Sequence, residues 1–278
     1  MDTAALDEVR EFYTELPFNY YESATNALEH IGHNPLKAYP DLDLALADGG
    51  VETVLELGCG AGWASNSMAL HYGCQVTAVD FTAAAVARAR EVAGLLGTSD
   101  TIKFHCQDLY TFEPGEHFDL VFSMGVLHHT SDCRAGVQHA SRFVKRDGLL
   151  YLGLYHSYGR RPFLKHYQDM VEAQGEDHAF ARFQETLQHQ TDTVHSKSWF
   201  RDQVLHPFET QHSFEEVHHW LKELGFDVLS TSINRFDEIG SIEDLFEQEK
   251  AFADLSLQRN IEEKTFYPGF FTIMAARS

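Results

Sequence analysis

The stretch that decides the fold is 54–63, which reads Val-Leu-Glu-Leu-Gly-Cys-Gly-Ala-Gly-Trp. Its mostly apolar first half predicts a buried strand, and its three glycines predict a tight turn that leads into a helix. Because glycine has no Cβ, the backbone of such a turn can pass close to a ligand. Structural turns and dinucleotide sites share glycine-rich patterns, so the turn alone does not identify the ligand.

Short β-rich runs alternate with helical runs on the C-terminal side of this turn. The β-rich runs after Val51 are 53–57, 75–80, 102–108, 118–123 and 149–155, with a helix expected over 135–144. This alternation predicts an α/β fold with a Rossmann-like, doubly wound, mostly parallel sheet and helices on both faces. Two further strands are expected at 226–233 and 270–276, which makes seven.

The rest of the chain divides around this core. Apolar residues at helical spacing in 4–16 predict a leading helix. Residues 157–212 are rich in His, Gln and Phe and show no strand pattern, so they predict a helical insertion after the fifth strand. We therefore expect four parts, which are an N-terminal helical cap (1–50), the ligand-binding core (51–156), the insertion as a lid over the acceptor (157–212) and the C-terminal part of the core (213–278).

Composition and charge bound the class of protein. The 278 residues, of which 44% are hydrophobic, suffice for one sizeable α/β domain with a cap. The formal net charge of −21 repels a phosphate backbone, so nucleic-acid substrates are disfavoured. Arg160–Arg161 is a tight basic pair that offers a local exception.

The cysteine spacing and the length of the apolar runs indicate where in the cell the protein is found. The four cysteines are too far apart for a CxxC metal or redox unit, and the start of the chain lacks the layout of a signal peptide. No apolar run approaches the roughly 20 residues that a membrane helix needs. We expect a soluble, cytoplasmic protein with reduced thiols and no membrane partner.

Three features argue against a nicotinamide dinucleotide. Bulky Trp63 stands where the G-x-G-x-x-G fingerprint needs its third glycine. Glu56 precedes the turn. Two acids, Asp80 and Asp108, end the second and third predicted strands, and a ribose together with an adenine amino group would account for both.

Four motifs in order resemble the class I S-adenosylmethionine-dependent methyltransferases. They are Glu-Leu-Gly-Cys-Gly-Ala-Gly at 56–62, Ala-Val-Asp at 78–80, Gln-Asp-Leu at 107–109 and the run 118–130. The final run 270–276 is similar to the antiparallel seventh strand of that family. The resemblance implies that S-adenosylmethionine (SAM) is the cofactor.

The resemblance also implies roles for residues of the core. Gly58, Gly60 and Gly62 would line the methionine part, Asp80 would bind both ribose hydroxyls, and Asp108 would bind the adenine amino group. Phe81 and Leu109 would flank the base, and Met124 would lie behind the adenine. We also assign to the cofactor Glu56 and Cys59 of the turn and two tyrosines of a predicted aromatic lid, Tyr20 and Tyr21.

Methyl transfer from a sulfonium needs alignment of the acceptor, exclusion of water and acceptance of a proton. Candidates follow strand ends, where open α/β sheets bind ligands. As catalytic candidates we name His128, His156, Asp202 and His206, and as acceptor-binding candidates His129, Tyr155, Arg160 and Trp199. The alternative for each histidine is that it only caps or packs the following helix.

A metal site is a further alternative for the insertion, because His206, Glu209 and His212 lie close in sequence. Positions i and i+6 of a helix point about 240° apart, and Pro207 interrupts a helix, so these residues do not share one face. We expect no metal. The sequence thus predicts a SAM-dependent methyltransferase for a small-molecule acceptor, with a protein or tRNA methyltransferase, or a SAM-binding protein without transferase activity, as alternatives.

Overall fold

A seven-stranded sheet forms the centre of the computed structural model, which describes residues 3–187 and 192–278. The strands are β1 (Thr53–Leu57), β2 (Gln75–Asp80), β3 (Ile102–Cys106), β4 (Phe118–Met124), β5 (Val144–Tyr155), β6 (Phe226–Thr231) and β7 (Phe270–Arg277). Their order is β3-β2-β1-β4-β5-β7-β6, and β7 runs antiparallel to both of its neighbours. This confirms the predicted Rossmann-like fold.

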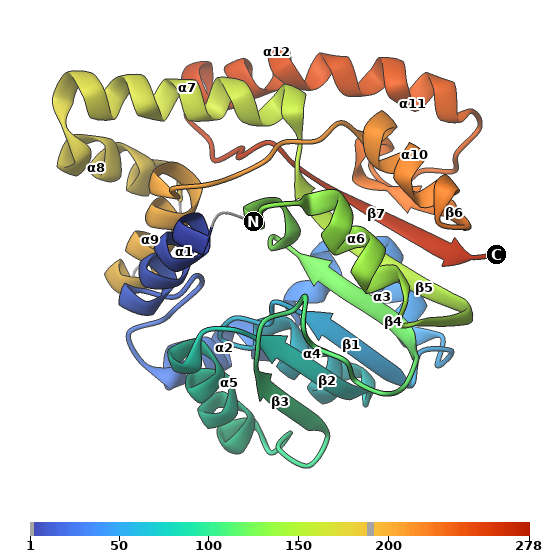
Figure 1. Ribbon diagram of the computed structural model, residues 1–278. Coiled ribbons are helices and arrows are strands. Elements are labelled where there is room, and N and C mark those ends of the chain that lie inside the picture. Colours follow the sequence, from blue (N-terminus) through green and yellow to red (C-terminus); the bar gives the residue numbers. More distant parts are fainter. Residues whose placement is uncertain (1–2, 188–191) are drawn as a thin grey trace.

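Helices cover both faces of the sheet and extend beyond it (Figure 1). They are α1 (Thr3–Glu15), α2 (Ala24–Gly32), α3 (Pro40–Ala47), α4 (Trp63–Tyr72), α5 (Ala83–Leu96), α6 (Cys133–Ser141), α7 (Ser157–Gln174), α8 (Glu176–Thr186), α9 (Thr193–Phe200), α10 (Phe214–Glu223), α11 (Ile242–Gln248) and α12 (Phe252–Leu257). Short helical turns η2 (Leu127–His129), η3 (Arg201–Leu205) and η5 (Glu249–Ala251) matter for the site.

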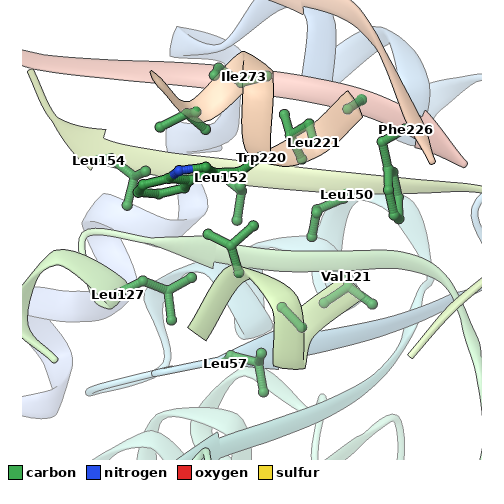
Figure 2. Close-up of a cluster of buried hydrophobic side chains, with 14 of the residues drawn as sticks. Leu57, Val121, Leu127, Leu150, Leu152, Leu154, Trp220, Leu221, Phe226 and Ile273 are labelled. Atoms are coloured by element: carbon green, nitrogen blue, oxygen red, sulfur yellow. The ribbon is translucent and has the colours of Figure 1, made fainter. Parts of the chain in front are cut away.

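Successive side chains of a strand point to opposite faces of the sheet, so each face has a hydrophobic core of its own. Leu55 and Leu57 of β1 face one core, whereas Val54 faces the other, as the period of two along a strand requires. Figure 2 shows the first core, in which Trp220 and Leu221 of α10 lie over β5. The second core is filled by α3, α4 and the end of α5.

The insertion has a small core of its own. Buried aromatic side chains of α7, α8 and α9, with Phe163, Tyr167, Phe183 and Phe200 among them, pack together away from the sheet. Helix α1 lies beside α9 (Figure 1). The N-terminal segment therefore packs on the insertion, although more than 170 residues separate them in sequence.

Several expected element boundaries are wrong. The strands expected over 102–108 and 226–233 end at Cys106 and Thr231. The helix expected over 135–144 ends at Ser141, and β5 begins at Val144 rather than at 149. Val144 pairs with Phe118, and the register shifts before Leu120 pairs with Leu149. Asp147 adopts a positive φ of 62° within this irregular stretch. The polar residues 145–147 do not show the apolar pattern of a strand, so the sequence did not predict that β5 begins here.

Candidate functional site

A cavity lies at the carboxyl ends of β1, β2 and β4, where the strand order reverses and open α/β sheets bind ligands. It has about 1020 Å³ of unfilled space, part of it open to solvent. The core contributes most of the lining, with Gly58, Cys59, Gly60, Ala61, Trp63, Asp80, Phe81, Thr82, Ala85, Asp108, Leu109, Tyr110, Met124, Gly125, Val126, His129 and Thr130. The N-terminal segment adds Val9, Tyr13, Pro17, Phe18 and Asn19.

The glycines of the turn have different roles. Gly58 has a φ of +80°, and a Cβ there would lie 2.4 Å from Cγ2 of Val126. A Cβ on Gly60 would meet nothing within 4 Å, so its position faces open space in the cavity lining. Gly62 is outside the lining, and its missing Cβ lets α4 approach Ala89 of α5.

Asp80 is held by the backbone at the end of β2. Its Oδ2 accepts from the Gly60 amide at 2.9 Å, and its Oδ1 accepts from the Thr82 amide at 2.8 Å. Burial raises the pKa of this carboxyl above its ordinary value. Because a carboxylate has about four acceptor positions, each oxygen keeps a lone pair for a ligand in the cavity.

Asp108 stands on the cavity wall after β3. Its Oδ1 accepts from the Tyr110 amide at 2.8 Å, which fixes the carboxylate. Phe81, Leu109 and Met124 line the same cavity and supply apolar surface. The arrangement suits a flat base between apolar side chains with a carboxylate at its edge.

Glu56 lies outside the cavity lining and is buried in β1. Ser65 of α4 donates a hydrogen bond to its carboxyl group. Burial raises the pKa of Glu56 to about 8. The contact joins β1 to α4 directly behind the glycine turn.

The N-terminal segment closes one side of the cavity, but with other residues than the predicted tyrosines. The Tyr20 ring lies under the guanidinium of Arg88, at 4.3 Å, and the Tyr21 ring stacks on His195, at 4.0 Å. Neither lines the cavity. Sequence reasoning missed Tyr13 and Phe18, although the apolar periodicity of α1 and the aromatic run that follows were visible.

His129 is the member of the predicted histidine set that lines the cavity. Its Nδ1 lies 3.1 Å from the Phe208 carbonyl oxygen. Burial lowers the pKa of His129 to about 3, so the ring is neutral. Its Nε2 is buried and has no hydrogen-bond partner in the described part of the chain.

His128 and His206 flank His129 outside the lining. The ring centres of His206 and His129 are 3.8 Å apart, and those of His128 and His129 are 4.4 Å apart. His128 also stacks on Tyr155 at 3.8 Å. Burial lowers the pKa of both flanking histidines, that of His206 to about 3.

Asp202 of η3 connects this histidine group to the N-terminal segment. Its Oδ1 accepts from the Tyr13 hydroxyl at 2.6 Å and lies 3.8 Å from Nε2 of His129. Its Oδ2 accepts from the side-chain amide Nε2 of Gln203 at 2.9 Å and from the Tyr155 hydroxyl at 3.3 Å. Burial raises the pKa of the Asp202 carboxyl.

Arg160 is fully buried and its donors are all engaged. Nε donates to Glu209, Nη1 to Gln203 and to the Pro268 carbonyl, and Nη2 to Gln203 and Glu209. The guanidinium lies 3.6 Å from the centre of the Tyr155 ring. Since guanidinium has five N–H groups, Arg160 has no donor left for an acceptor molecule.

His156 and Trp199 also lie away from the cavity lining. His156 Nε2 lies 2.9 Å from Oε2 of Glu249, in a buried contact that also receives the Phe214 amide at the start of α10. Trp199 donates from its indole N–H to Asn19 at 3.2 Å, so it supports the N-terminal segment. Both side chains organise the elements around the cavity.

The donors considered for a metal have other partners. Glu209 binds Arg160, and His212 lies 2.9 Å from Glu216 through Nδ1 and 2.8 Å from Thr210 through Nε2. Within residues 3–187 and 192–278, no group of three or more His, Cys, Asp or Glu side chains is arranged to hold a metal ion. None of the described helices is both long and apolar enough to cross a membrane.

The fold and the motifs define the class of protein. Residues 54–148 match a family model described as a methyltransferase domain. This domain and the fold are those of the class I S-adenosylmethionine-dependent methyltransferases, as the motifs predicted, and solved structures of this fold hold SAM or SAH.

Particular relatives agree with this class. A ubiquinone biosynthesis O-methyltransferase of Glaesserella parasuis is 33% identical over 36% of this chain and 43% of its own length. A magnesium protoporphyrin IX methyltransferase of Synechocystis, solved with bound SAH, has a TM-score of 0.55 and 15% identity over 100% of this chain and 95% of its own. A [4+2]-cyclase has a TM-score of 0.50 and 19% identity over 85% of this chain and 80% of its own. This chain matches less than half of the length of this ubiquinone biosynthesis O-methyltransferase and of a further curated relative from Synechococcus.

Proposed function

We propose that this protein transfers the sulfonium methyl group of SAM to a small-molecule acceptor by direct in-line attack. The observation that carries the proposal is one cavity with a lining of two chemical kinds. The glycine turn, Asp80 and Asp108 contribute to it, and so do Tyr13 and His129. Cofactor and acceptor can thus meet in one cavity.

The first part of this lining fits SAM residue by residue. We assign Asp80 to the ribose hydroxyls, since its oxygens keep free lone pairs beside the Gly60 amide. We assign Asp108 to the adenine amino group, between the apolar surfaces of Leu109 and Met124. When bound, SAM supplies an electrophilic methyl group, so the protein needs no nucleophile of its own.

The roof of the cavity, formed by the N-terminal segment, favours a small acceptor. The N-terminal segment places Val9, Tyr13 and Phe18 over the cavity and is fixed to the insertion by Asn19. A protein or tRNA acceptor would have to displace this roof, and the net charge of −21 opposes tRNA. We therefore interpret 1–50 as a cap and 157–212 as the insertion that holds it.

The location is also a proposal. Cys59, Cys74, Cys106 and Cys133 are free thiols, the state that a reducing compartment maintains. We propose a cytoplasmic enzyme on this basis.

A labelling experiment separates the candidate functions. Purified protein is titrated calorimetrically with SAM, then incubated with methyl-labelled SAM and a cell extract divided into small-molecule, protein and RNA fractions. Label in the small-molecule fraction is expected. Label only in protein or RNA would replace the proposal with a macromolecular acceptor. SAM binding without transfer to any fraction would favour a non-transferase, a possibility that the shared fold of a [4+2]-cyclase makes concrete.

A further inference from the structure

We propose that the side-chain amide of Asn19 binds the carboxylate of the methionine part of SAM, and that this bond couples cofactor binding to docking of the cap on the insertion. The inference rests on the proposed function and adds to it a residue outside the motifs. It follows from the hydrogen-bonding capacity of Asn19, from the donors that remain in the cavity lining, and from the place of the loop that carries Asn19.

The orientation of the Asn19 amide is fixed by its two partners on α9. The indole N–H of Trp199, which can only donate, lies 3.2 Å from Oδ1 of Asn19. Nε2 of His195 contacts the same oxygen and donates to it. Because a carbonyl oxygen has two lone pairs, these contacts use the whole acceptor capacity of the side chain. What the side chain still offers is the two N–H groups of Nδ2.

Nδ2 of Asn19 is a free donor in a buried residue. Asn19 is only 7% exposed, and it lines the cavity. Among the described residues Nδ2 has no hydrogen-bond partner, and unlike Nε2 of His129 it is not enclosed by protein atoms. A buried donor without a partner costs free energy. The structure therefore favours a ligand that brings a hydrogen-bond acceptor to this point of the lining.

The rest of the lining has few donors left for such a ligand. Most of its other polar side chains donate to acceptors of the protein itself, and these are Tyr13, Cys59, Thr82, Tyr110, His129 and Thr130. Trp63 keeps one indole N–H, on a partly exposed ring. The described lining contains no lysine or arginine. An anionic group in this cavity therefore relies on neutral donors, and besides backbone amides Asn19 supplies two of them from one side chain.

The carboxylate of SAM is the group that matches these donors. The ammonium group of the methionine part can only donate. The ribose hydroxyls and the adenine amino group are assigned to Asp80 and Asp108, whose carboxylates accept. A carboxylate has about four acceptor positions, and hydrogen bonds to an ionised acceptor are the stronger kind. Without such donors its desolvation in the cavity would be costly.

The loop that carries Asn19 runs beside α5, close to the glycine turn. Arg88 of α5 lies 4.3 Å from the centre of the Tyr20 ring and donates to the Tyr21 carbonyl at 2.9 Å. Figure 1 shows the chain passing from α1 to α2 next to α5. α5 packs in turn on α4, which begins where the glycine turn ends. Asn19 thus belongs to the side of the cavity where the glycine turn would hold the methionine part.

One side chain would then join the cofactor to the insertion. Oδ1 of Asn19 is held by α9, and Nδ2 would be held by the carboxylate. Asn19 has a φ of +54°, in the left-handed region that few residue types other than Gly, Asn and Asp adopt readily. The amino-acid part of the cofactor should therefore stabilise the docked loop 17–23, whereas a ligand without the carboxylate should not.

Two ligands that differ only in the carboxylate test the proposal. They are S-adenosylhomocysteine (SAH) and its decarboxylated analogue S-adenosyl-3-thiopropylamine, and calorimetry measures both affinities in wild type, Asn19→Asp and Asn26→Asp. Aspartate at 19 still accepts from Trp199 and His195, so this variant keeps the junction with α9 and loses the donors. Asn26→Asp is the matched control: it adds the same charge to the cap and removes a 2.8 Å bond to Asp192 of the insertion, outside the cavity lining.

We expect the wild type to bind SAH about ten-fold more tightly than the analogue, a preference that one hydrogen bond to a charged group supports. In Asn19→Asp the preference should fall below about three-fold, because the donors are gone, and in Asn26→Asp it should stay unchanged. A second measurement needs no substitution. Amide hydrogen exchange of the wild type should slow at 17–23 with saturating SAH and not with the saturating analogue.

Four results would overturn the inference. They are equal affinities of the two ligands for the wild type, an unchanged preference in Asn19→Asp, an equal loss of preference in Asn26→Asp, and equal protection of 17–23 by both ligands. Absence of SAH binding would overturn the proposed function together with this inference. The expected preference without methyl transfer in the labelling experiment would refute the proposed transfer alone and leave Asn19 as a ligand of the cofactor.

Discussion

The hydroxyl of Tyr13 donates a 2.6 Å hydrogen bond to Oδ1 of Asp202, across 189 residues of sequence. The contact joins the first helix to the insertion directly above the cavity. Arg201 of the insertion also donates to the Phe12 carbonyl of this helix, and Trp199 donates to Asn19 in the loop that follows it. The cap and the insertion therefore hold each other in place, and the cavity is enclosed only when both are docked.

Tyr13→Phe should loosen the cap, because the lost hydrogen bond to a buried carboxylate contributes about 1.5–3 kcal/mol. We expect faster amide hydrogen exchange in 3–15 and several-fold weaker SAM binding. Tyr20→Phe is the control, since it keeps the ring under Arg88. Exchange in 3–15 that is the same in both variants would show that this contact does not hold the cap.

Asp80→Ala should weaken SAM binding by at least ten-fold. Each hydrogen bond from a ribose hydroxyl to the carboxylate is worth about 1.5–3 kcal/mol, and ten-fold corresponds to about 1.4 kcal/mol. Calorimetry measures the affinity, and circular dichroism confirms folding. The exposed Asp100→Ala should bind normally; a folded Asp80→Ala protein with the same affinity would refute the assignment of Asp80.

Arg160→Lys should destabilise the protein by about 1–3 kcal/mol, because the ammonium keeps the charge beside Glu209 but cannot bond Gln203, Pro268 and Glu209 together, which leaves buried acceptors unsatisfied. Lysine cannot reproduce the five donors of guanidinium. Arg161→Lys changes the adjacent, exposed residue in the same way and should leave stability unchanged. Urea unfolding of both variants provides the comparison, and equal midpoints would show that the Arg160 network contributes little.

Glu56→Gln should change how stability depends on pH. The folded-state pKa of about 8 exceeds the ordinary value of 4.5, so the folded protein binds this proton more tightly and loses stability as pH rises from about 4.5 to about 8. Glutamine cannot ionise, so the variant should gain stability relative to wild type across that window, on the order of a few kcal/mol. Melting temperatures at pH 5 and pH 8.5 measure the difference; parallel curves would contradict a buried, protonated Glu56.

Residues that follow strand ends were predictable, whereas residues placed by loops were not. Asp80 ends β2 and Asp108 stands two residues beyond β3, and the apolar pattern of both strands is clear, so their edge of the sheet follows from the sequence. His128 and His129 are neighbours, and the turn η2 decides which of them lines the cavity. Nothing in the local sequence encodes that choice.

Contacts between residues distant in sequence explain the remaining differences between the predicted and the observed site. In the sequence, Arg160 has no acidic neighbour and was predicted to bind an acceptor. In the structure it binds Glu209, which is 49 positions away. The aromatic run 18–21 indicated a lid, but Asn19 adopts a φ of +54° and binds Trp199. Phe18 therefore lines the cavity, whereas Tyr20 and Tyr21 pack elsewhere.

The place of β7 between β5 and β6 constrains the order of assembly during synthesis. β6 pairs with β7 and has no register with β5, so it cannot join the sheet until 270–277 have been made. Helix α10 packs beside β6 but also over β5, which is synthesised far earlier. The nascent chain can form the cofactor half of the sheet first, while β5 keeps an open edge that only β7 closes.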